Sequence, residues 1–247
     1  MKSGIFSAVA LPALLFAGCG PSPANTTATT NVTAARTTNT TAPAGTAPLP
    51  VVGKSDEATA KLVTQASELS VAGKFAEAIP LFEQALKANP DDEEVHFNLA
   101  FTLNRLGRTE DAIQHYRESL RLLPDYAEAH NNLGNLLSKK GEFAEAVTHF
   151  TASLKFQPQN SSAHNNLGTA LARQGKLSEA VEQFREATRI QPSYAEAWLN
   201  LGNSYVGLGR EQDAIEPLQN ALRANPGLTP ARNALLRLRA KLGNSAR

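Results

Sequence analysis

The sequence predicts an all-α protein in which five helical hairpins stack into an α-solenoid and a capping helix closes the stack. Three observations support this fold class. Pro, Gly and Ala recur at 34-residue intervals, apolar residues between them follow a helical period, and no segment carries a strand signal. The chain is rich in Ala and Leu and has 6% aromatic residues, a composition that also favours helices.

Residues 1–18 are predicted to be a signal peptide. Lys2 supplies a positive charge, and the apolar run over 5–17 is too short to cross a bilayer but fits a secretory signal. The next residues, FAGC at 16–19, resemble the bacterial lipobox, whose cysteine is lipidated and becomes the first residue of the mature protein. This resemblance implies a lipid anchor on Cys19, with acyl chains such as palmitate. The alternative is an ordinary secretory signal with an incidental cysteine.

Residues 19–57 are expected to form a disordered tether between this anchor and the hairpins. The stretch 21–50 contains ten Thr, seven Ala and five Pro, and Arg36 is its single charged residue. Such a segment buries too little apolar surface to offset the entropy lost on ordering. Asn-X-Thr sequons within it leave a second interpretation open, in which the segment is the glycosylated stalk of a secreted eukaryotic protein.

The region 58–228 is predicted to hold five contiguous units of 34 residues. Three sets of landmarks define their register: a proline at unit position 32, a glycine at position 15 and an alanine at position 20. The units are 59–92, 93–126, 127–160, 161–194 and 195–228.

Each unit is predicted to contain two helices. Apolar or small residues at positions 4, 7, 8 and 11 form the buried stripe of the first helix, and positions 20, 24, 27 and 28 form that of the second. The glycine at position 15 can adopt the left-handed conformation that ends a helix, and the proline at position 32 cannot extend one. The first unit departs from this pattern through Gln65 at position 7 and Pro80 inside its second helix, so we expect that unit to be kinked or frayed.

The pattern resembles the tetratricopeptide repeat family, whose W-x₂-L-G-x₂-Y, A-x₃-F and P landmarks share the 34-residue period. The match is best in the last unit and rests on Trp198, Leu201, Gly202, Tyr205, Ala214 and Pro226. The resemblance implies a right-handed superhelix, with the first helix of every unit lining a concave groove. Residues 229–247 are then expected to form the capping helix and tail, because a solenoid must shield its last apolar face.

The side chains expected to line this groove lie opposite the buried stripe of the first helices, at positions 6 and 9. A carboxamide both donates and accepts hydrogen bonds, so a row of asparagines could hold the backbone of an extended peptide. The row resembles the asparagine ladder of the O-linked N-acetylglucosamine transferases. An alternative role is local hydrogen bonding within the repeats. The predicted groove residues are Asn98, Asn132, Asn166 and Asn200 at position 6, and Phe101, Asn135, Thr169 and Asn203 at position 9.

Other kinds of site are not expected. The chain has 24 basic and 23 acidic residues, a balance that argues against nucleic acid as a partner. His96, His130 and His164 occupy position 4 of successive units, too far apart to share one zinc ion, and are expected to pack in place of an aromatic residue. His115 and His149 are expected at the surface. No nucleophile is paired with a base, so we predict no enzymatic activity, cofactor, metal or small-molecule substrate.

The sequence therefore predicts a lipid-anchored scaffold or assembly factor of the bacterial cell envelope that binds an extended segment of another protein. The membrane contact would be made through the N-terminal lipid, and the glycine after the cysteine favours the outer membrane, facing the periplasm. Two alternatives remain. The chain could recruit substrates for an enzyme supplied by another chain, such as a glycosyltransferase, or it could be the secreted protein with a glycosylated stalk.

Overall fold

The computed structural model describes residues 57–245, which form eleven α-helices. These are α1 Glu57–Val71, α2 Phe75–Ala88, α3 Glu93–Arg105, α4 Thr109–Leu122, α5 Ala127–Lys140, α6 Phe143–Phe156, α7 Ser161–Arg173, α8 Leu177–Ile190, α9 Ala195–Gly207, α10 Glu211–Ala224 and α11 Thr229–Ser245. The prediction of an all-α solenoid is confirmed for this part of the chain.

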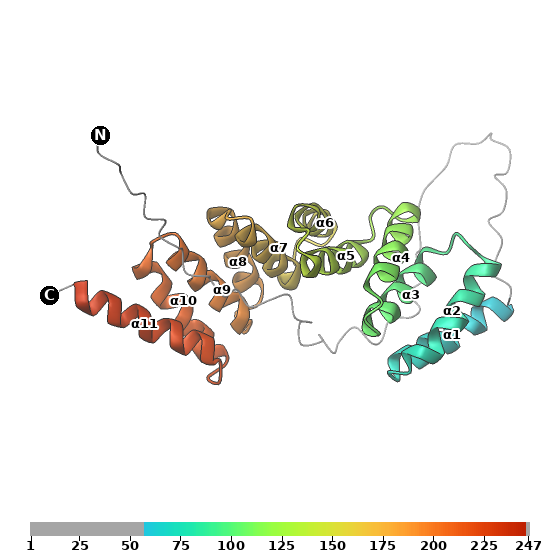
Figure 1. Cartoon of the computed structure of the whole chain (residues 1–247), viewed down its shortest axis with the longest axis horizontal. Coiled ribbons are helices and arrows are strands. Elements are labelled where there is room, and N and C mark those ends of the chain that lie inside the picture. Colours follow the sequence, from blue (N-terminus) through green and yellow to red (C-terminus); the bar gives the residue numbers. More distant parts are fainter. Residues whose placement is uncertain (1–56, 246–247) are drawn as a thin grey trace, which may run out of the picture.

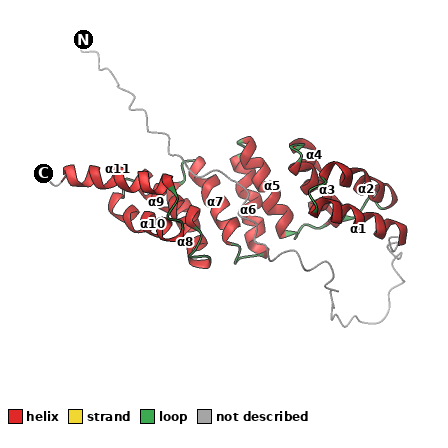
Figure 2. Ribbon diagram, turned by 90° about the horizontal axis from the view of Figure 1, so that it is seen from below, coloured by secondary structure: helices red, strands yellow, loops and turns green. Residues whose placement is uncertain are grey.

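The helices pair in chain order and the pairs stack along one axis, from α1 and α2 at one end to α11 at the other (Figures 1 and 2). Each odd-numbered helix packs against the even-numbered helix that follows it and against the one that precedes it. Odd-numbered helices also contact one another directly: α1 contacts α3, α5 contacts α7, α7 contacts α9, and α9 contacts α11. They therefore line one side of the stack, with weaker contact between α3 and α5 than between the other neighbours.

A left-handed glycine ends the turn between the two helices of every hairpin. These glycines have φ between 71° and 85°, where a residue with a Cβ is strained. They are Gly73, Gly107, Gly141, Gly175 and Gly209. The predicted role of position 15 is thus confirmed, and it explains why glycine recurs there without interruption.

The two helices of a hairpin approach closely where position 8 is glycine. A Cβ placed on Gly168 would lie 2.8 Å from a ring carbon of Phe184, which is fully buried, and Gly134 stands in the same relation to Phe150. The ring at position 24 of the second helix thus fills the space that a larger residue at position 8 would need. Glycine here serves packing, and its backbone conformation is ordinary.

The expectation that Pro80 would fray the first unit is wrong. Helix α2 runs unbroken through Pro80 from residue 75 to residue 88, and α10 likewise runs through Pro217. Each proline removes one N–H from the ladder of its helix, but the surrounding packing holds the helix together. Phe82, two residues after Pro80, is fully buried.

Helix α11 covers the apolar face of the last hairpin through Leu235 and Leu238, both buried, while Leu236 is 59% exposed. Within residues 57–245, no helix combines the length and the apolar character that a membrane span needs. The predicted signal peptide, Cys19 and the tether as far as residue 56 lie outside the described residues, whereas Glu57, the last residue of the predicted tether, begins α1.

Candidate functional site on the odd-numbered helices

Paired asparagines link successive odd-numbered helices. Asn166 Nδ2 donates to Asn131 Oδ1 over 3.4 Å, and Asn200 Nδ2 donates to Asn165 Oδ1 over 3.0 Å. In each link, the asparagine at position 6 of one unit reaches back to the asparagine at position 5 of the unit before it. Asn165 also donates to the hydroxyl of Tyr194 over 3.3 Å. The repeated AHNNLG sequence therefore encodes a chain of amides that runs from α5 through α7 to α9.

The chain of amides does not extend to α3, because position 5 of that unit is Phe97. The Phe97 ring stacks on Tyr126 with centroids 4.7 Å apart and meets Tyr116 edge-on at 5.6 Å. Asn132 has no amide to reach in α3 and instead lies beside the buried Tyr116 hydroxyl, whose pKa is raised chiefly by burial. The contact between α3 and α5 is also weaker than that between the other neighbouring odd-numbered helices.

These links bury several of the predicted groove residues, which corrects the prediction that all of them face solvent. Asn166 is 5% exposed, Asn200 is fully buried and Thr169, whose hydroxyl bonds to the Asn165 carbonyl, is buried as well. Positions 6 and 9 would face solvent on a single first helix, whereas neighbouring first helices cover one another here. The remaining predicted residues, which are partly or largely exposed, are Asn98, Phe101, Asn132, Asn135 and Asn203.

Four of these accessible residues occupy positions 6 and 9 of α3 and α5, and we call them the α3–α5 face: Asn98, Phe101, Asn132 and Asn135. Phe101 is 38% exposed, unusual for a ring of its size. The side-chain oxygen of Asn135 is buried and has no hydrogen-bond partner within the described residues, so it can accept a bond from a ligand only if the amide turns outward. The face thus offers amide groups beside an apolar ring.

The two edges of the α3–α5 face carry opposite charges, because the first helices begin with acidic residues and end with basic ones. At one edge the pKa of Glu94 is raised, first by burial and then by the neighbouring Asp92 and Glu93. At the other edge the Arg105 guanidinium lies 5.0 Å from the Phe75 ring centroid and 6.0 Å from that of Phe101. Charges at these helix ends complement the helix dipoles as well.

The histidines at position 4 replace an aromatic residue, as predicted. His130 Nε2 bonds to the Pro124 carbonyl at 3.1 Å, and the Trp198 indole N–H donates in the same way to Pro192 over 2.8 Å. His96 and His164 make the equivalent contacts with Pro90 and Pro158. These side chains therefore tie each first helix to the turn before it.

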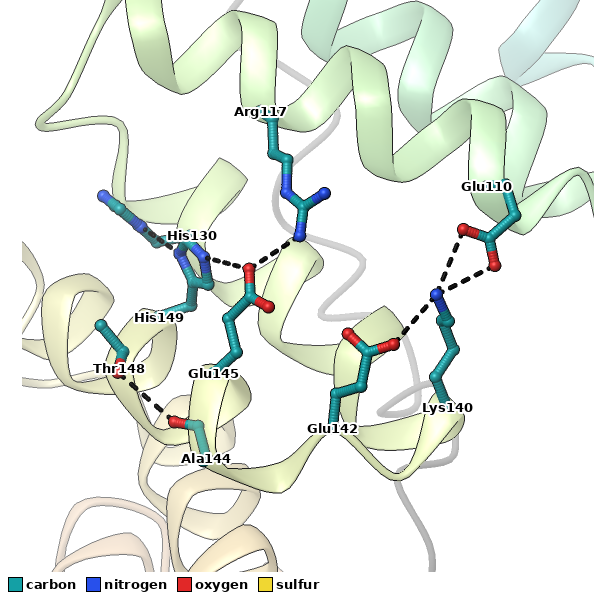
Figure 3. Close-up of polar contacts among 9 residues, drawn as sticks. All are labelled: Glu110, Arg117, His130, Lys140, Glu142, Ala144, Glu145, Thr148 and His149. Atoms are coloured by element: carbon teal, nitrogen blue, oxygen red, sulfur yellow. Dashed lines mark hydrogen bonds and ion pairs between the residues drawn. The ribbon is translucent and has the colours of Figure 1, made fainter.

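The prediction that His115 and His149 lie at the surface holds only in part, because both side chains are half-buried in contacts with another histidine. His149 Nδ1 lies 2.9 Å from His130 Nδ1, and His115 Nδ1 lies 2.9 Å from His96 Nδ1 (Figure 3 shows the first of these pairs). The His149 side chain is only 17% exposed. In the fourth unit Gln183 takes the same place, 2.9 Å from His164. The regular 19-residue spacing of the two residues in each pair was the feature of the sequence that could have indicated these contacts.

The described part of the chain contains no group of three or more His, Cys, Asp or Glu side chains that could hold a metal ion. Most of its ion pairs join side chains two to four residues apart in the sequence, and a few join neighbouring helices. Arg117 of α4 contacts Glu145 of α6 at 2.8 Å, and Lys140 contacts Glu110 at 3.0 Å (Figure 3). Such pairs fix the positions of adjacent hairpins and are weak contributors to stability.

Comparisons with known proteins agree with this architecture. The family model described as tetratricopeptide repeat matches residues 63–127, 131–195 and 165–229. A search of curated proteins finds no match.

Several solved structures share the fold. YrrB, described as a TPR protein with an unusual peptide-binding site, is 22% identical over 70% of this chain and 89% of its own, with a TM-score of 0.65. A MamA protein is 24% identical over 69% and 93% of the two chains, with a TM-score of 0.65. MamA from Desulfovibrio magneticus RS-1 is 18% identical over 71% and 99%, with a TM-score of 0.67.

Proposed function

Because the chain belongs to the tetratricopeptide repeat family, we propose that it is a protein-interaction scaffold that binds an extended segment of a partner on the α3–α5 face. The observation that carries this proposal is the difference in accessibility along the odd-numbered helices. The amides of Asn166 and Asn200 form hydrogen bonds between helices, whereas Asn98 and Asn132 remain partly exposed on the face that carries Phe101. YrrB, a fold relative, has a peptide-binding site, which makes this class of ligand the natural one to test.

The chemistry of the α3–α5 face suits a peptide backbone with one apolar side chain. Asparagine amides can donate to backbone carbonyls and accept from backbone N–H groups, so they hold a main chain with little regard to its sequence. Phe101 offers a ring against which an apolar or aromatic side chain can pack. The partner segment would point basic side chains towards Glu94 and Glu128, and acidic ones towards Arg105.

The proposal is tested by selecting peptides from a random display library on the whole protein and measuring the affinity of the selected peptides. Asn98→Ala with Asn132→Ala removes two hydrogen bonds of about 1 kcal/mol each, so the affinity should fall roughly thirtyfold. Asn220→Ala, which changes an asparagine on the even-numbered helix α10, is the matched control and should leave the affinity unchanged. Equal affinity for the double variant, with its fold intact by circular dichroism, would remove the α3–α5 face from consideration.

The envelope location and the lipid anchor are a second part of the proposal. They are supported by the short apolar run before Cys19 and by the likeness of residues 16–19 to a lipobox. Lipidation would place the repeats at a membrane surface, in our proposal the outer membrane on its periplasmic side. Cys19→Ser should move the protein from the membrane fraction to the soluble fraction and abolish acyl labelling. A variant that stays with the membrane would argue against this anchor.

A further inference from the structure

The two histidine pairs lie inside the hairpins that carry the α3–α5 face. His96 and His115 join α3 to α4, and His130 and His149 join α5 to α6. In both pairs the ring centroids are 5.2 Å apart although the nitrogens are 2.9 Å apart, so the rings point at each other through their Nδ1 atoms and do not stack.

This head-on geometry fits a shared proton and does not fit a metal ion. A zinc ion lies about 2.0–2.1 Å from each nitrogen that binds it. The two Nδ1 atoms are 2.9 Å apart, so an ion midway between them would be too close to both. An ion would therefore have to lie off the line on which the two nitrogens face each other. A hydrogen bond between two Nδ1 atoms needs one proton, and it needs the second nitrogen to be unprotonated.

The neighbouring carbonyl decides which ring holds which proton. Since the Pro124 carbonyl can only accept, His130 must carry its proton on Nε2. Neutral His130 then accepts at Nδ1, so His149 is the donor and its own Nε2 is bare. That nitrogen lies 3.8 Å from Glu145 Oε1 (Figure 3). The same reasoning applies to His96, which donates to the Pro90 carbonyl, and to its partner His115.

We propose that the two histidine pairs form an acid-sensitive latch, which holds with up to one added proton per pair and opens when a second proton arrives. The first added proton can go to the bare Nε2 of His149, beside Glu145, and leaves the bond between the rings intact. A second proton on the pair would place two N–H groups head to head at 2.9 Å, and the helices would have to separate.

The groups around each pair influence the pH at which His149 and His115 take up the first proton. The pKa of His149 is lowered, first by burial and then by the charge on His130; Glu145 opposes this shift and Arg117 of α4 adds to it. The pKa of His115 is lowered first by burial and then by the charge on His96. Arg108 adds to this shift, whereas Asp111 and Glu83 of α2 oppose it.

The direction of the pH effect follows from these shifts. Folding depresses the pKa of His115 and of His149, so the unfolded chain binds more protons than the folded one in acid. The stability that the pairs contribute is complete above the ordinary histidine pKa of about 6.5 and is lost as the pH falls below it.

The fourth unit contains a natural contrast. Gln183 faces His164 at the same 2.9 Å, and an amide can present its NH₂ to a neutral imidazole or its oxygen to a protonated one. A His–Gln contact thus survives protonation when the amide turns, whereas a doubly protonated His–His contact does not. Acid is therefore expected to loosen α3 to α6 while α7 to α10 keep their packing.

The test uses the whole protein without any peptide, so it is independent of the proposed binding function. Nitrogen-15 spectra at pH 8 should show His149 and His115 protonated on Nδ1, and His130 and His96 on Nε2. Hydrogen exchange should show that protection in α3–α6 falls more than in α7–α10 between pH 7.5 and pH 5. Nε2 protonation of all four rings, or a uniform loss of protection, would overturn the latch.

The matched variant copies the contact of the fourth unit into the other two. His115→Gln with His149→Gln should reduce the proton uptake on unfolding near pH 5 by about two protons, one per pair, as judged from the pH dependence of the urea midpoint. Gln183→His should add about one proton by creating a third pair. If neither variant changes the pH dependence, the pairs do not act as a latch. If the latch fails while selected peptides still bind the α3–α5 face, the proposed function stands.

Discussion

Asn200→Ala is expected to destabilise the protein far more than Asn132→Ala, although both change position 6 of a first helix. Asn200 is fully buried and donates to Asn165 Oδ1, which is itself in a buried side chain. Removing the donor leaves that oxygen without this bond, at a cost of about 1–3 kcal/mol. Asn132 is partly exposed and has no amide partner at position 5 of the preceding unit, so its loss should cost less than about 1 kcal/mol. The change in helix propensity is the same in both variants and cancels.

The comparison is best made by urea unfolding followed by circular dichroism, with both variants measured beside the wild type. A difference of about 2 kcal/mol corresponds to roughly 4–8 °C in melting temperature for a chain of this size. Asn165→Ala alone and combined with Asn200→Ala completes a double-mutant cycle, and a coupling of about 0.5–1.5 kcal/mol is expected. Equal losses for Asn200→Ala and Asn132→Ala would refute the assignment of separate roles to the two asparagines.

Two further predictions concern packing and surface charge. Gly168→Ala places a Cβ against the buried Phe184 ring and should lower the free energy of unfolding by about 1–3 kcal/mol, despite better helix propensity. Gly243→Ala adds a Cβ that meets nothing within 4 Å, so it should not lower the free energy of unfolding. Thermal melts of the two variants test this difference. Arg117→Ala breaks the ion pair with Glu145, whose side chains are 53% and 42% exposed. It should lower the free energy of unfolding by less than about 1 kcal/mol, and by less still in high salt. Urea unfolding at two ionic strengths measures both effects.

The repeat architecture could be predicted from the sequence because its signals are local and recur. Glycine at position 15 is required by a backbone conformation, and the small residue at position 8 is required by a ring on the facing helix. Both constraints lie within one hairpin, so one unit of sequence is enough to recognise them. Pro80 was the exception, since packing around α2 outweighed the local preference of one residue.

The roles of the asparagines could not be predicted in the same way, because they depend on contacts between units. Position 6 faces away from the buried stripe of its own helix, and a helical wheel therefore predicts exposure. Whether it is exposed depends on how closely the next first helix approaches and on which residue that helix offers at position 5. The 35-residue spacing of Asn131 from Asn166, and of Asn165 from Asn200, was the available signal.

A single position thus explains why one region of an otherwise regular stack remains open. Where position 5 is asparagine, it accepts from the next unit, the first helices are tied together, and the amides are no longer available to a ligand. Where position 5 is Phe97, the ring packs on Tyr126 and Tyr116 instead, and Asn132 keeps part of its surface in solvent. The same substitution therefore withdraws an internal acceptor and leaves the Asn132 amide beside the Tyr116 hydroxyl with part of its surface in solvent, where a peptide can reach it.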